Sequence, residues 1–464
     1  MDQNVWWSTV ALQGWSDRRG TRYQKLAEAV HDAIGRRLLI PGQRVPAERV
    51  LADLVGVSRG TVVRAFEELV AAGLLERIQG SGTYVRMRSG EILSTRSDIQ
   101  PEDASDRLDF SRPGPASPHN LPRYDAVFDA DALSAVGDPA FGISLLRNEL
   151  AHYMSEVLGV PTERTQIFVT SGNRESVKLL WSGLSLAGRA AAIACPSWLE
   201  AVPGSGQWAR RVVALRTDGD GLDVDGAARH LRRAPESVLV LSTTNGPAGI
   251  PLAASRRHRL AHTLERGTVL AIEDISDAAH HVEPDGVGAP LCGLSDKVVA
   301  VGELDRMLHS GLGIGWIRMP QPQLANFRLP ERFRSPGVPS QLLAARALRA
   351  ADGGWFADLR ARSARQRTYL VGQLAQAIPS WAPEPGGQGP GLWVRLPVPE
   401  ASSFTHVARR FGVQIGDGAQ YCVDGAHHDT IWLSTGHEDA TVDLAVDRLT
   451  AAWHEYTHRV AATV

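Results

Sequence analysis

Two polar segments follow apolar, strand-like stretches of the chain, and their residue types suit the binding of charged groups. Ser171, Gly172 and Asn173 come directly after the strand-like segment 167–170 and open a helical pattern. Backbone amides at the start of a helix bind phosphate and carboxylate groups well. Asp274 follows another apolar segment and offers a carboxylate. The sequence therefore predicts an anion-binding turn and a carboxylate, each at the end of a strand.

Arg306 follows a third apolar segment, 298–301, whereas Lys297 precedes it. A guanidinium stays protonated at any physiological pH, so Arg306 cannot act as an amine nucleophile. Its paired donors suit carboxylate or phosphate groups. Lys297 has an amine, but it lies at the other end of this segment from Arg306. We therefore expect Arg306 to contact a charged or polar group and to form no covalent bond.

Cysteines and histidines predict no further chemistry. Cys195, Cys292 and Cys422 show no spacing typical of a metal site or a redox pair, and we expect buried thiols. Histidine pairs occur at 280–281 and 427–428. Adjacent residues on a strand point to opposite faces, so neither pair predicts a metal site.

The elements that must position these residues follow one alternating pattern from residue 108 to 460. Strand-like segments lie at 167–170, 191–194, 237–241, 269–272 and 298–301, with helical patterns between them. This alternation predicts an α/β domain with a mostly parallel, doubly wound sheet covered by helices. Residues 88–107 are polar and lack apolar periodicity, which is typical of a linker.

Residues 21–87 form a different pattern, in which three helical segments precede a hairpin. The helices are expected over 22–37, over 47–54 and after Ser58, which is placed to cap the third helix. The second helix is expected to turn Val50, Leu51 and Leu54 to the core. Strand-like segments 74–78 and 83–85 flank a glycine-rich turn. This order predicts a winged helix-turn-helix domain.

The third helix of such a domain enters the major groove of double-stranded DNA with its N-terminal end. The residues expected to reach bases and phosphates there are Ser58, Arg59, Gly60, Thr61 and Arg64. Arg44 and Arg49 flank the second helix and are expected to hold phosphates. Gly80 lets the wing approach the duplex closely.

Composition agrees with a soluble protein of more than one domain. At 464 residues, typical domain sizes of about 100 to 200 residues predict two or three domains. No apolar run approaches the roughly 20 residues of a membrane span, and the start is no secretory signal, so we expect a cytoplasmic location. The net charge is -2, but residues 21–89 hold eleven Lys and Arg against seven Asp and Glu. The basic residues are therefore concentrated where DNA binding is predicted.

Several segments resemble known families. Residues 21–87 look like the winged helix of the GntR family, and the segments that carry this resemblance are VPAER (45–49), VSRGTVVRAF (57–66) and GSGTYV (80–85). Residues from about 110 to 460 resemble the fold-type I aminotransferase domain of the MocR subfamily. Its members are typically homodimeric regulators that use pyridoxal phosphate as an effector cofactor. The resemblance implies a homodimer that binds operator DNA.

The resemblance also assigns roles in a cofactor site. Asp274 stands where the family aspartate meets the pyridine nitrogen, segment 171–173 where the phosphate binds, and Asn245 in the loop that approaches the ring. Arg306, however, stands where the lysine that forms the aldimine is expected. Other departures are Ser276 for a tyrosine, Gly313 for an arginine, Trp432 for the carboxylate-binding arginine, and Trp198 for a tyrosine.

These departures predict a transcription regulator that is not an enzyme, with pyridoxal phosphate bound non-covalently at best. Three uses of the pocket remain open. It is an effector site in which Arg306 meets an anionic or polar ligand stacked on Trp198 or Trp432, a vestigial scaffold for dimerisation, or a non-covalent cofactor site. The competing functions are a pyridoxal-phosphate-dependent enzyme and a DNA binder that no effector controls.

Overall fold

The computed structural model describes residues 7, 12, 14–35, 39, 45–72, 74–78, 82–85, 107–114, 121–124, 140–198, 211–244, 246–280, 289–309 and 311–461. The chain divides into two compact units. One comprises Met1–Leu108, Leu396–Gln414 and Asp447–Val464, and the other Asp109–Arg395 and Ile415–Val446. Of the predicted linker 88–107, only Arg107 lies among the described residues, so the predicted domain boundaries stay a prediction.

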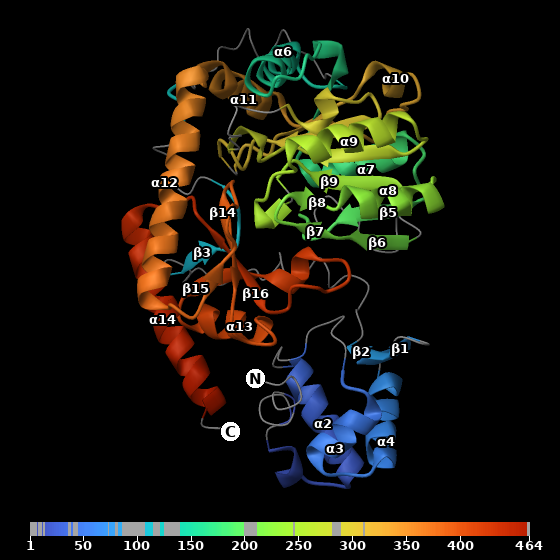
Figure 1. Cartoon of the computed structure of the whole chain (residues 1–464), viewed down its shortest axis with the longest axis vertical. Coiled ribbons are helices and arrows are strands. Elements are labelled where there is room, and N and C mark those ends of the chain that lie inside the picture. The colour runs from blue at the N-terminus through green and yellow to red at the C-terminus, as the bar shows by residue number, and fades with distance from the viewer. Residues whose placement is uncertain are drawn as a thin grey trace. The chain divides into compact units, whose positions relative to one another are not determined.

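The N-terminal helices and hairpin follow the predicted order (Figure 1). They are α2 (Arg22–Gly35), α3 (Glu48–Val55), α4 (Arg59–Ala71), β1 (Leu75–Ile78) and β2 (Gly82–Val85). Strands β1 and β2 pair antiparallel, from Leu75 opposite Val85 to Ile78 opposite Gly82. Leu26, Leu51 and Phe66 from the three helices share one buried cluster with Val85 of the hairpin. The helices and the wing therefore close around a common core.

Local sequence explains how α3 and α4 are joined. Gly56 ends α3 in the left-handed conformation, at φ +67°, which glycine adopts without strain. Ser58 caps α4, as predicted, because its Oγ accepts a hydrogen bond from the Thr61 amide at 3.2 Å. The expectation for Val50 was wrong. It is 39% exposed, since Leu51 and Ala52 form the buried face of this short helix.

The second unit contains a seven-stranded sheet in the order β4-β12-β11-β10-β9-β5-β6. Neighbouring strands from β11 to β6 run parallel, and β12 runs antiparallel to both β11 and β4. The strands are β4 (Ile167–Thr170), β5 (Ala190–Ala194), β6 (Arg211–Leu215), β9 (Val238–Ser242), β10 (Leu270–Asp274), β11 (Val298–Glu303) and β12 (Gly315–Arg318). A mostly parallel sheet is therefore confirmed.

Both faces of this sheet are buried. Ala271 and Ala300 enter one apolar cluster, whereas their neighbours Ile272 and Val301 enter another. Successive side chains of a strand point to opposite faces, so each cluster fills the space between the sheet and one layer of helices. This double burial is why the strands read as continuous apolar runs in the sequence.

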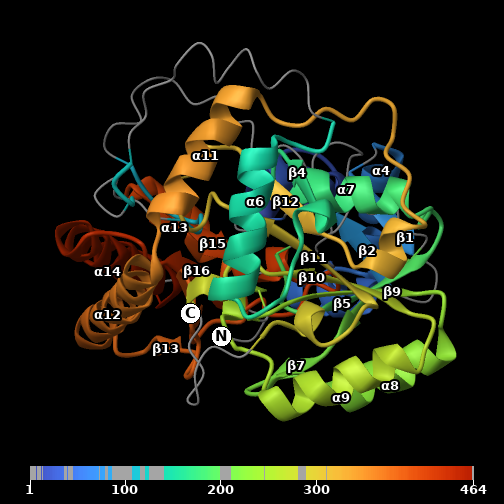
Figure 2. The ribbon, with the colours of Figure 1, turned by 90° about the horizontal axis from the view of Figure 1, so that it is seen from above.

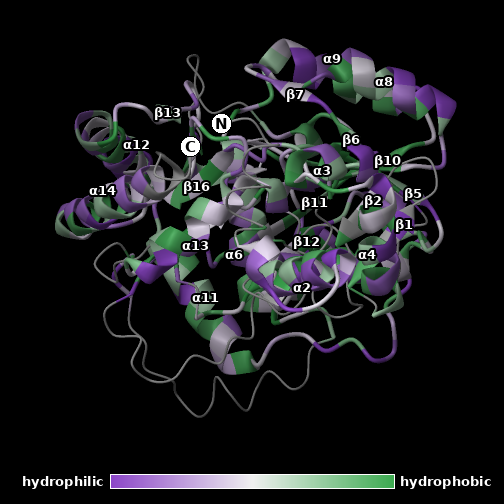
Figure 3. Cartoon of the chain, turned by 90° about the horizontal axis from the view of Figure 1, so that it is seen from below, coloured by the Kyte–Doolittle hydropathy of each residue, from purple (hydrophilic) through white to green (hydrophobic). Residues whose placement is uncertain are grey.

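The remaining helices are α6 (Ser144–His152), α7 (Asn173–Gly183), α8 (Val224–Arg233), α9 (Ala254–Glu265), α10 (Gln321–Leu324), α11 (Val338–Ala350), α12 (Gly353–Ala377), α13 (Ser402–Arg410) and α14 (Asp439–Ala461). Figure 2 shows α8 and α9 side by side along one flank of the sheet. Both carry mainly hydrophilic residues, drawn purple in Figure 3. They shield the sheet with their few apolar residues and turn most polar ones to solvent, except Arg257 of α9, which is buried and donates to the Ala289 carbonyl at 3.0 Å.

A second sheet of five strands has the order β13-β14-β16-β15-β3. Its strands are β3 (Leu108–Phe110), β13 (Ala382–Pro383), β14 (Gly391–Arg395), β15 (Val413–Asp417) and β16 (Thr430–Ser434), and a separate pair is formed by β7 (Thr217–Asp218) and β8 (Gly221–Leu222). In the part of the chain that the structure describes, no helix has the length and apolar character that a membrane span requires.

Candidate functional site

The ends of three strands of the large sheet, β4, β10 and β11, bring the predicted site residues together. Asp274 ends β10, Glu303 ends β11, and Thr170 ends β4 immediately before α7. The register pairs Glu303 with Gly315 and Gly315 with Thr170 across β12. The segment after β4 and the segments after β10 and β11 therefore meet at one edge of the sheet.

Arg306 occupies the centre of this edge and is 3% exposed. Its Nε donates to Glu303 Oε1 at 2.8 Å, and its Nη1 donates to Asp277 Oδ2 at 3.0 Å. Asp274 Oδ2 lies 3.7 Å from Nη2. One buried guanidinium therefore bridges three carboxylates. Such a group stays charged and is held by its partners.

Asp274 is held from its other side by Asn173 and Ser276. Its Oδ1 accepts hydrogen bonds from Asn173 Nδ2 at 3.0 Å and from the Ser276 amide and hydroxyl at 2.9 and 2.6 Å. Ser276 Oγ also accepts from Asn173 Nδ2 at 2.7 Å and from the Glu303 amide at 3.1 Å. Ser276 therefore connects the ends of β10 and β11.

Glu303 also lies at the N-terminus of α7, the predicted anion-binding turn. The Asn173 amide donates to Glu303 Oε2 at 3.2 Å. Gly172, at φ +129°, forms the turn, and a side chain at Gly315 would lie 2.6 Å from its Cα. A carboxylate of the protein thus binds the helix end where an anionic ligand was expected. Ser171, in the same turn, is exposed.

Burial and crowded negative charge shift the pKa of two carboxyls here. Burial, together with the neighbouring Asp274 and Glu303, raises the pKa of Asp277 to about 6 despite the lowering effects of Arg306 and Trp198. Burial and the neighbouring Glu303 raise the pKa of Asp305 to about 7. Arg306 alone does not neutralise this group of carboxylates.

Trp198 covers one face of the Arg306 guanidinium. The guanidinium Cζ lies 4.5 Å from the ring centroid, and the indole Nε1 donates to Asp277 Oδ2 at 3.1 Å. Trp198 meets Tyr421 and Trp432 edge to face, with centroids 5.5 and 5.4 Å apart. Trp432, on β16, is fully buried. Both tryptophans proposed to stack a ligand are therefore packed against protein side chains.

Two cysteines are not thiols, contrary to the expectation from sequence. Cys195 and Cys422 form a disulfide across 227 residues, and only Cys292 is a free, buried thiol among the three. Ligand atoms of Cys195, Cys422 and His427 lie within 4.8 Å of one another, but the two sulfurs are bonded to each other. The prediction failed because strand order, not spacing in the sequence, brings the two cysteines together.

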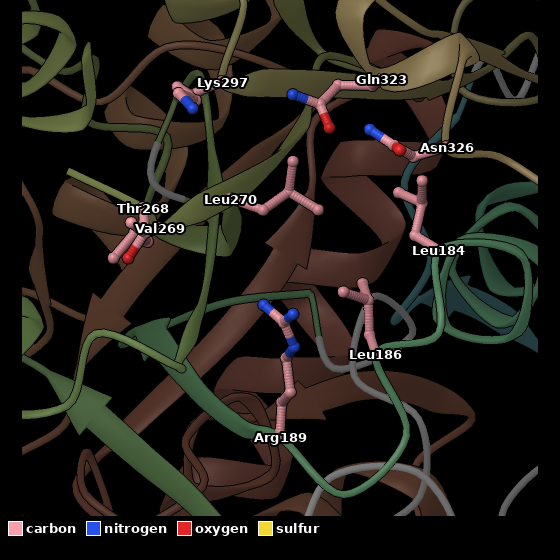
Figure 4. Close-up of a pocket in the computed structure, with 9 residues that line it drawn as sticks. All are labelled: Leu184, Leu186, Arg189, Thr268, Val269, Leu270, Lys297, Gln323 and Asn326. Atoms are coloured by element: carbon pink, nitrogen blue, oxygen red, sulfur yellow. The ribbon is translucent and has the colours of Figure 1, made fainter. Parts of the chain in front are cut away.

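The cavities in the described part of the second unit lie at opposite edges of the parallel sheet. A cavity of ≈ 30 Å³, lined by Arg306, His280 and Arg362 among others, holds about one or two water molecules. A larger pocket of ≈ 270 Å³ lies where β10 and β11 begin, and Lys297 lines it (Figure 4). Lys297 precedes β11 whereas Arg306 follows it, as the sequence indicated.

The predicted DNA-contacting residues that the structure describes lie on α3 and at the start of α4. Arg49 and Arg59 are exposed, and Arg59 donates to Glu48 Oε2 at 3.2 Å. Arg77 of β1, which sequence reasoning missed, donates to the other oxygen of Glu48 at 3.1 Å. Glu48 thus holds two arginines, one from the third helix and one from the wing, on one surface.

Other predicted DNA-contacting residues near the start of α4 also contact side chains of the protein. Arg64 lies over the Tyr23 ring of α2, with Cζ 4.4 Å from the centroid. The hydroxyls of Ser58 and Thr61 are 2.9 Å apart and share a hydrogen bond. Gly60 is exposed within the first turn. These residues therefore also stabilise the helix and its packing.

Three predicted residues lie outside the described part of the chain: Arg44, Gly80 and Asn245. Sequence reasoning also missed Glu303 and Asp277, the two carboxylates hydrogen-bonded to Arg306. The charge pair three residues apart, Glu303 and Arg306, was a visible signal, and Asp277 directly follows Ser276.

Comparison with known proteins agrees with this architecture. Residues 22–85 match the family described as "Bacterial regulatory proteins, gntR family". The chain is 27% identical over 310 residues to the HTH-type pyridoxine biosynthesis transcriptional regulator PdxR of Corynebacterium glutamicum, covering 64% of this chain and 66% of that protein. It is 26% identical to the probable rhizopine catabolism regulatory protein MocR of Rhizobium meliloti, covering 73% and 74% of the two chains.

Among solved structures, an archaeal alanine:glyoxylate aminotransferase has a TM-score of 0.66 with 21% identity, covering 79% of this chain and 94% of that one. This similarity establishes the aminotransferase fold, and the family match establishes the helix-turn-helix domain. Residues 22–85 therefore form a GntR-type helix-turn-helix domain, the rest of the chain includes a domain with the aminotransferase fold, and the chain is similar to MocR-type transcription regulators.

Proposed function

We propose that this regulator binds operator DNA as a homodimer and that its aminotransferase-like domain neither transaminates nor binds pyridoxal phosphate covalently. One observation carries the proposal. Arg306 is buried after β11, and its guanidinium contacts Glu303, Asp277 and Asp274. A guanidinium cannot form a Schiff base with an aldehyde, and three carboxylates of the protein already surround this one.

The described side chains do not fit pyridoxal phosphate. A phosphate at the start of α7 would meet the Glu303 carboxylate, which already accepts the Asn173 amide. Two anions at one helix end repel each other, and their burial increases the cost. A pyridine nitrogen beside Asp274 would have to displace Arg306 from a 3.7 Å ion pair. Cofactor binding therefore requires both charged contacts to break.

A small-molecule effector remains part of the proposal, but it would need a different arrangement of the side chains around Arg306 from the one described here. The ≈ 30 Å³ cavity beside Arg306 is too small for an effector. An anionic or polar effector at Arg306 would need Trp198 to move aside. Of the open uses, the arrangement favours a scaffold, with an effector site only in a rearranged form.

DNA recognition is proposed through Ser58, Arg59, Thr61 and Arg64 at the start of α4 and through phosphate contacts of Arg44 and Arg49. We also propose the division into a domain at 21–87, a linker at 88–107 and a second domain at 108–460. The homodimer is proposed because sites of this fold are usually built at a subunit interface and a two-fold protein matches a palindromic operator.

Mixing the protein with excess pyridoxal phosphate and reducing with borohydride tests the proposal. We expect no cofactor attached at Lys297 or Arg306 and no yellow absorbance, whereas an active aminotransferase treated in parallel gives both. Stable attachment at either residue would support the alternative, an enzyme. Binding to the protein's own upstream DNA, with and without a metabolite panel, then separates an effector-controlled regulator from a DNA binder that no effector controls.

A further inference from the structure

The disulfide between Cys195 and Cys422 lies next to the Arg306 cluster, and neither the fold nor the regulator function accounts for it. We propose that this pair is a reversible redox site whose oxidation state changes operator binding. The effect on DNA rests on the proposed function of the chain as a DNA-binding regulator. The redox chemistry itself does not.

The two cysteines belong to segments of different sheets. The Cys195 amide donates to the Leu215 carbonyl at 2.9 Å, and Thr217 Oγ1 donates to the Cys195 carbonyl at 2.7 Å. Cys422 follows the 3-10 helix Gly418–Tyr421. The disulfide therefore joins the end of β5 in the large sheet to the turn after β15 in the second sheet. Cys195 and Cys422 are 8% and 6% exposed, so small opening motions suffice to admit a reagent.

The surroundings suit thiol chemistry. A ring nitrogen of His427 lies within 4.8 Å of both sulfur atoms. Burial lowers the pKa of His427, so its imidazole is neutral near pH 7 and can accept a proton from a thiol. The thiolate is the reactive form of cysteine, and the base favours it, whereas the Asp424 carboxylate, whose Oδ1 lies 3.8 Å from Cys195 Sγ, opposes loss of the Cys195 proton. Once reduced, the pair is therefore equipped to be oxidised again.

Cys292 provides the contrast within the same chain. It is 2% exposed, and burial raises the pKa of its thiol well above the ordinary value. The neighbouring Glu273 carboxylate adds to that effect. A buried thiol of this kind stays protonated and inert. Cys292 is thus a natural control for any reagent that acts on Cys195 and Cys422.

The linkage reaches the Arg306 cluster within three residues. The Ser197 amide donates to the Tyr421 carbonyl at 2.8 Å, so the two joined segments also share a backbone hydrogen bond. Trp198, the next residue, packs edge to face on Tyr421 and covers Arg306. Opening the disulfide frees one constraint on the segment that carries Trp198. Reduction is therefore expected to loosen the cover over Arg306.

The compartment of a bacterial DNA-binding protein argues against a passive crosslink. Thiol-reducing systems act wherever the chromosome lies, and disulfides found there are usually catalytic or redox-sensing.

Reduction of the disulfide consumes one molecule of a dithiol. Its two electrons and two protons break the S–S bond and leave two thiols, while the dithiol becomes a disulfide. Closing consumes one molecule of hydrogen peroxide. One thiolate attacks it to give a sulfenic acid, the second thiol displaces hydroxide from that sulfur, and two molecules of water are released in all.

Counting thiols tests the redox site directly. The folded full-length protein is treated with dithiothreitol or with hydrogen peroxide in the presence of a chelator, then unfolded, labelled with a maleimide and weighed. The sequence holds three cysteines, so the reduced form binds three labels and the oxidised form one. We expect interconversion in both directions. A disulfide that survives dithiothreitol in the folded protein, or thiols that peroxide cannot rejoin, would refute the proposal.

Operator binding of the two forms tests the consequence. We expect affinities that differ by about fivefold or more, as for a typical coupling between two sites. Cys195→Ser and Cys422→Ser should each abolish the difference, and Cys292→Ser should keep it. Equal affinities of the oxidised and reduced parent would overturn the regulatory part. If neither form binds operator DNA, the proposed function fails while the thiol count still stands.

Zinc gives the competing outcome. Thiolates of Cys195 and Cys422 with His427 form a donor set that Zn²⁺ accepts when the disulfide is open. Reduced protein is therefore incubated with Zn²⁺ without chelator, desalted and analysed for bound metal. We expect no stoichiometric zinc. One tightly held zinc ion per chain that blocks oxidation by peroxide would make the pair a metal site and overturn the redox proposal.

Discussion

The guanidinium of Arg306 lies over the indole ring of Trp198, with 4.5 Å between Cζ and the ring centroid. The same indole donates to Asp277, which also accepts from Arg306. An arginine over an aromatic face gains about 2 kcal/mol when desolvated. Trp198 and Asp277 therefore hold the guanidinium by its face and by its edge, and the arginine has a fixed position rather than a range of rotamers.

Replacing Arg306 by leucine should destabilise the second unit strongly. Glu303, Asp277 and Asp274 would lose their shared cation inside the protein, and removing one partner of a buried ion pair typically costs about 3 to 5 kcal/mol. The free energy of unfolding in urea measures the effect. Arg395→Leu is the control, because its pair with Asp429 is exposed and should contribute less than about 1 kcal/mol. Equal losses in the two variants would contradict this account.

Arg306→Lys should not restore covalent cofactor binding, although it supplies the missing amine. Glu303 would still bind the Asn173 amide where the phosphate is needed. The double variant Arg306→Lys, Glu303→Ser removes both obstacles and should react with pyridoxal phosphate more than the single variant does. Absorbance spectra and borohydride trapping compare the two. Full reaction of the single variant would show that Glu303 does not obstruct the site.

Arg59→Ala and Thr61→Ala should weaken binding to the specific operator by about 1 to 3 kcal/mol each, because both residues lie in the first turn of α4, Arg59 exposed and Thr61 half-buried. Titrations of labelled operator at matched salt give the difference. Circular dichroism must show an intact fold, since Thr61 also shares a hydrogen bond with Ser58. Affinity equal to that of the parent in both variants would remove α4 from the recognition surface.

Arg49→Ala should lower affinity for specific and unrelated DNA alike and reduce the salt dependence by about one phosphate contact. Arg49 is exposed on α3, and a phosphate contact carries no sequence information. The slope of log affinity against log salt measures this change. A loss confined to the specific operator would instead make Arg49 a base-reading residue.

Asp417→Asn should stabilise the protein above about pH 6. Burial raises the pKa of Asp417 to about 6, so the folded state binds more protons than the unfolded state between about pH 4 and 6. The stability that protonated Asp417 contributes is complete below about pH 4 and is lost as the pH rises through 6. Asparagine keeps an oxygen that can accept the Ala419 amide and carries no charge. The gain should be on the order of 2 kcal/mol near pH 8 and vanish near pH 4.

Urea unfolding of parent and variant across this range measures that gain. Asp225→Asn serves as control, because this carboxylate is on the surface, with its side chain 68% exposed, and its replacement should change little at any pH. A stability difference between Asp417→Asn and the parent that does not vary with pH would contradict the prediction.

The buried parallel strands could be predicted from the sequence because each is apolar on both faces. Segment 167–170 coincides with β4, and the other four expected strands differ from the observed ones by one to two residues at their ends. Strand β6 (Arg211–Leu215), at the edge of the sheet, was missed, and so was β12 (Gly315–Arg318). All four residues of β12 are buried, but the charged Arg318 breaks the apolar pattern of the segment. Its burial is compensated by a hydrogen bond from Nη1 to the Cys292 carbonyl at 3.0 Å.

The site could be predicted only in part. Asp274, Asn173 and Arg306 each follow a strand, and strand ends of a parallel sheet meet at one edge. The spacing of Glu303 and Arg306 signals their ion pair, but the contacts of Arg306 with Asp277 and Asp274 could not be predicted, because they depend on side-chain directions. The Cys195–Cys422 disulfide depends on contact between two separate sheets, for which the sequence gives no local signal.

Glu303 at the start of α7 has a consequence for how the thermal stability of the protein depends on the supply of a ligand. A protein that binds a vitamin-derived ligand only when folded gains stability with the ligand's concentration, and its melting temperature follows the nutritional state of the cell. Here the anion at the helix end is part of the polypeptide and is present in equal amount with every chain. Thermal unfolding of this protein should therefore give the same midpoint whether the cells that make it are starved of vitamin B6 or fed with it.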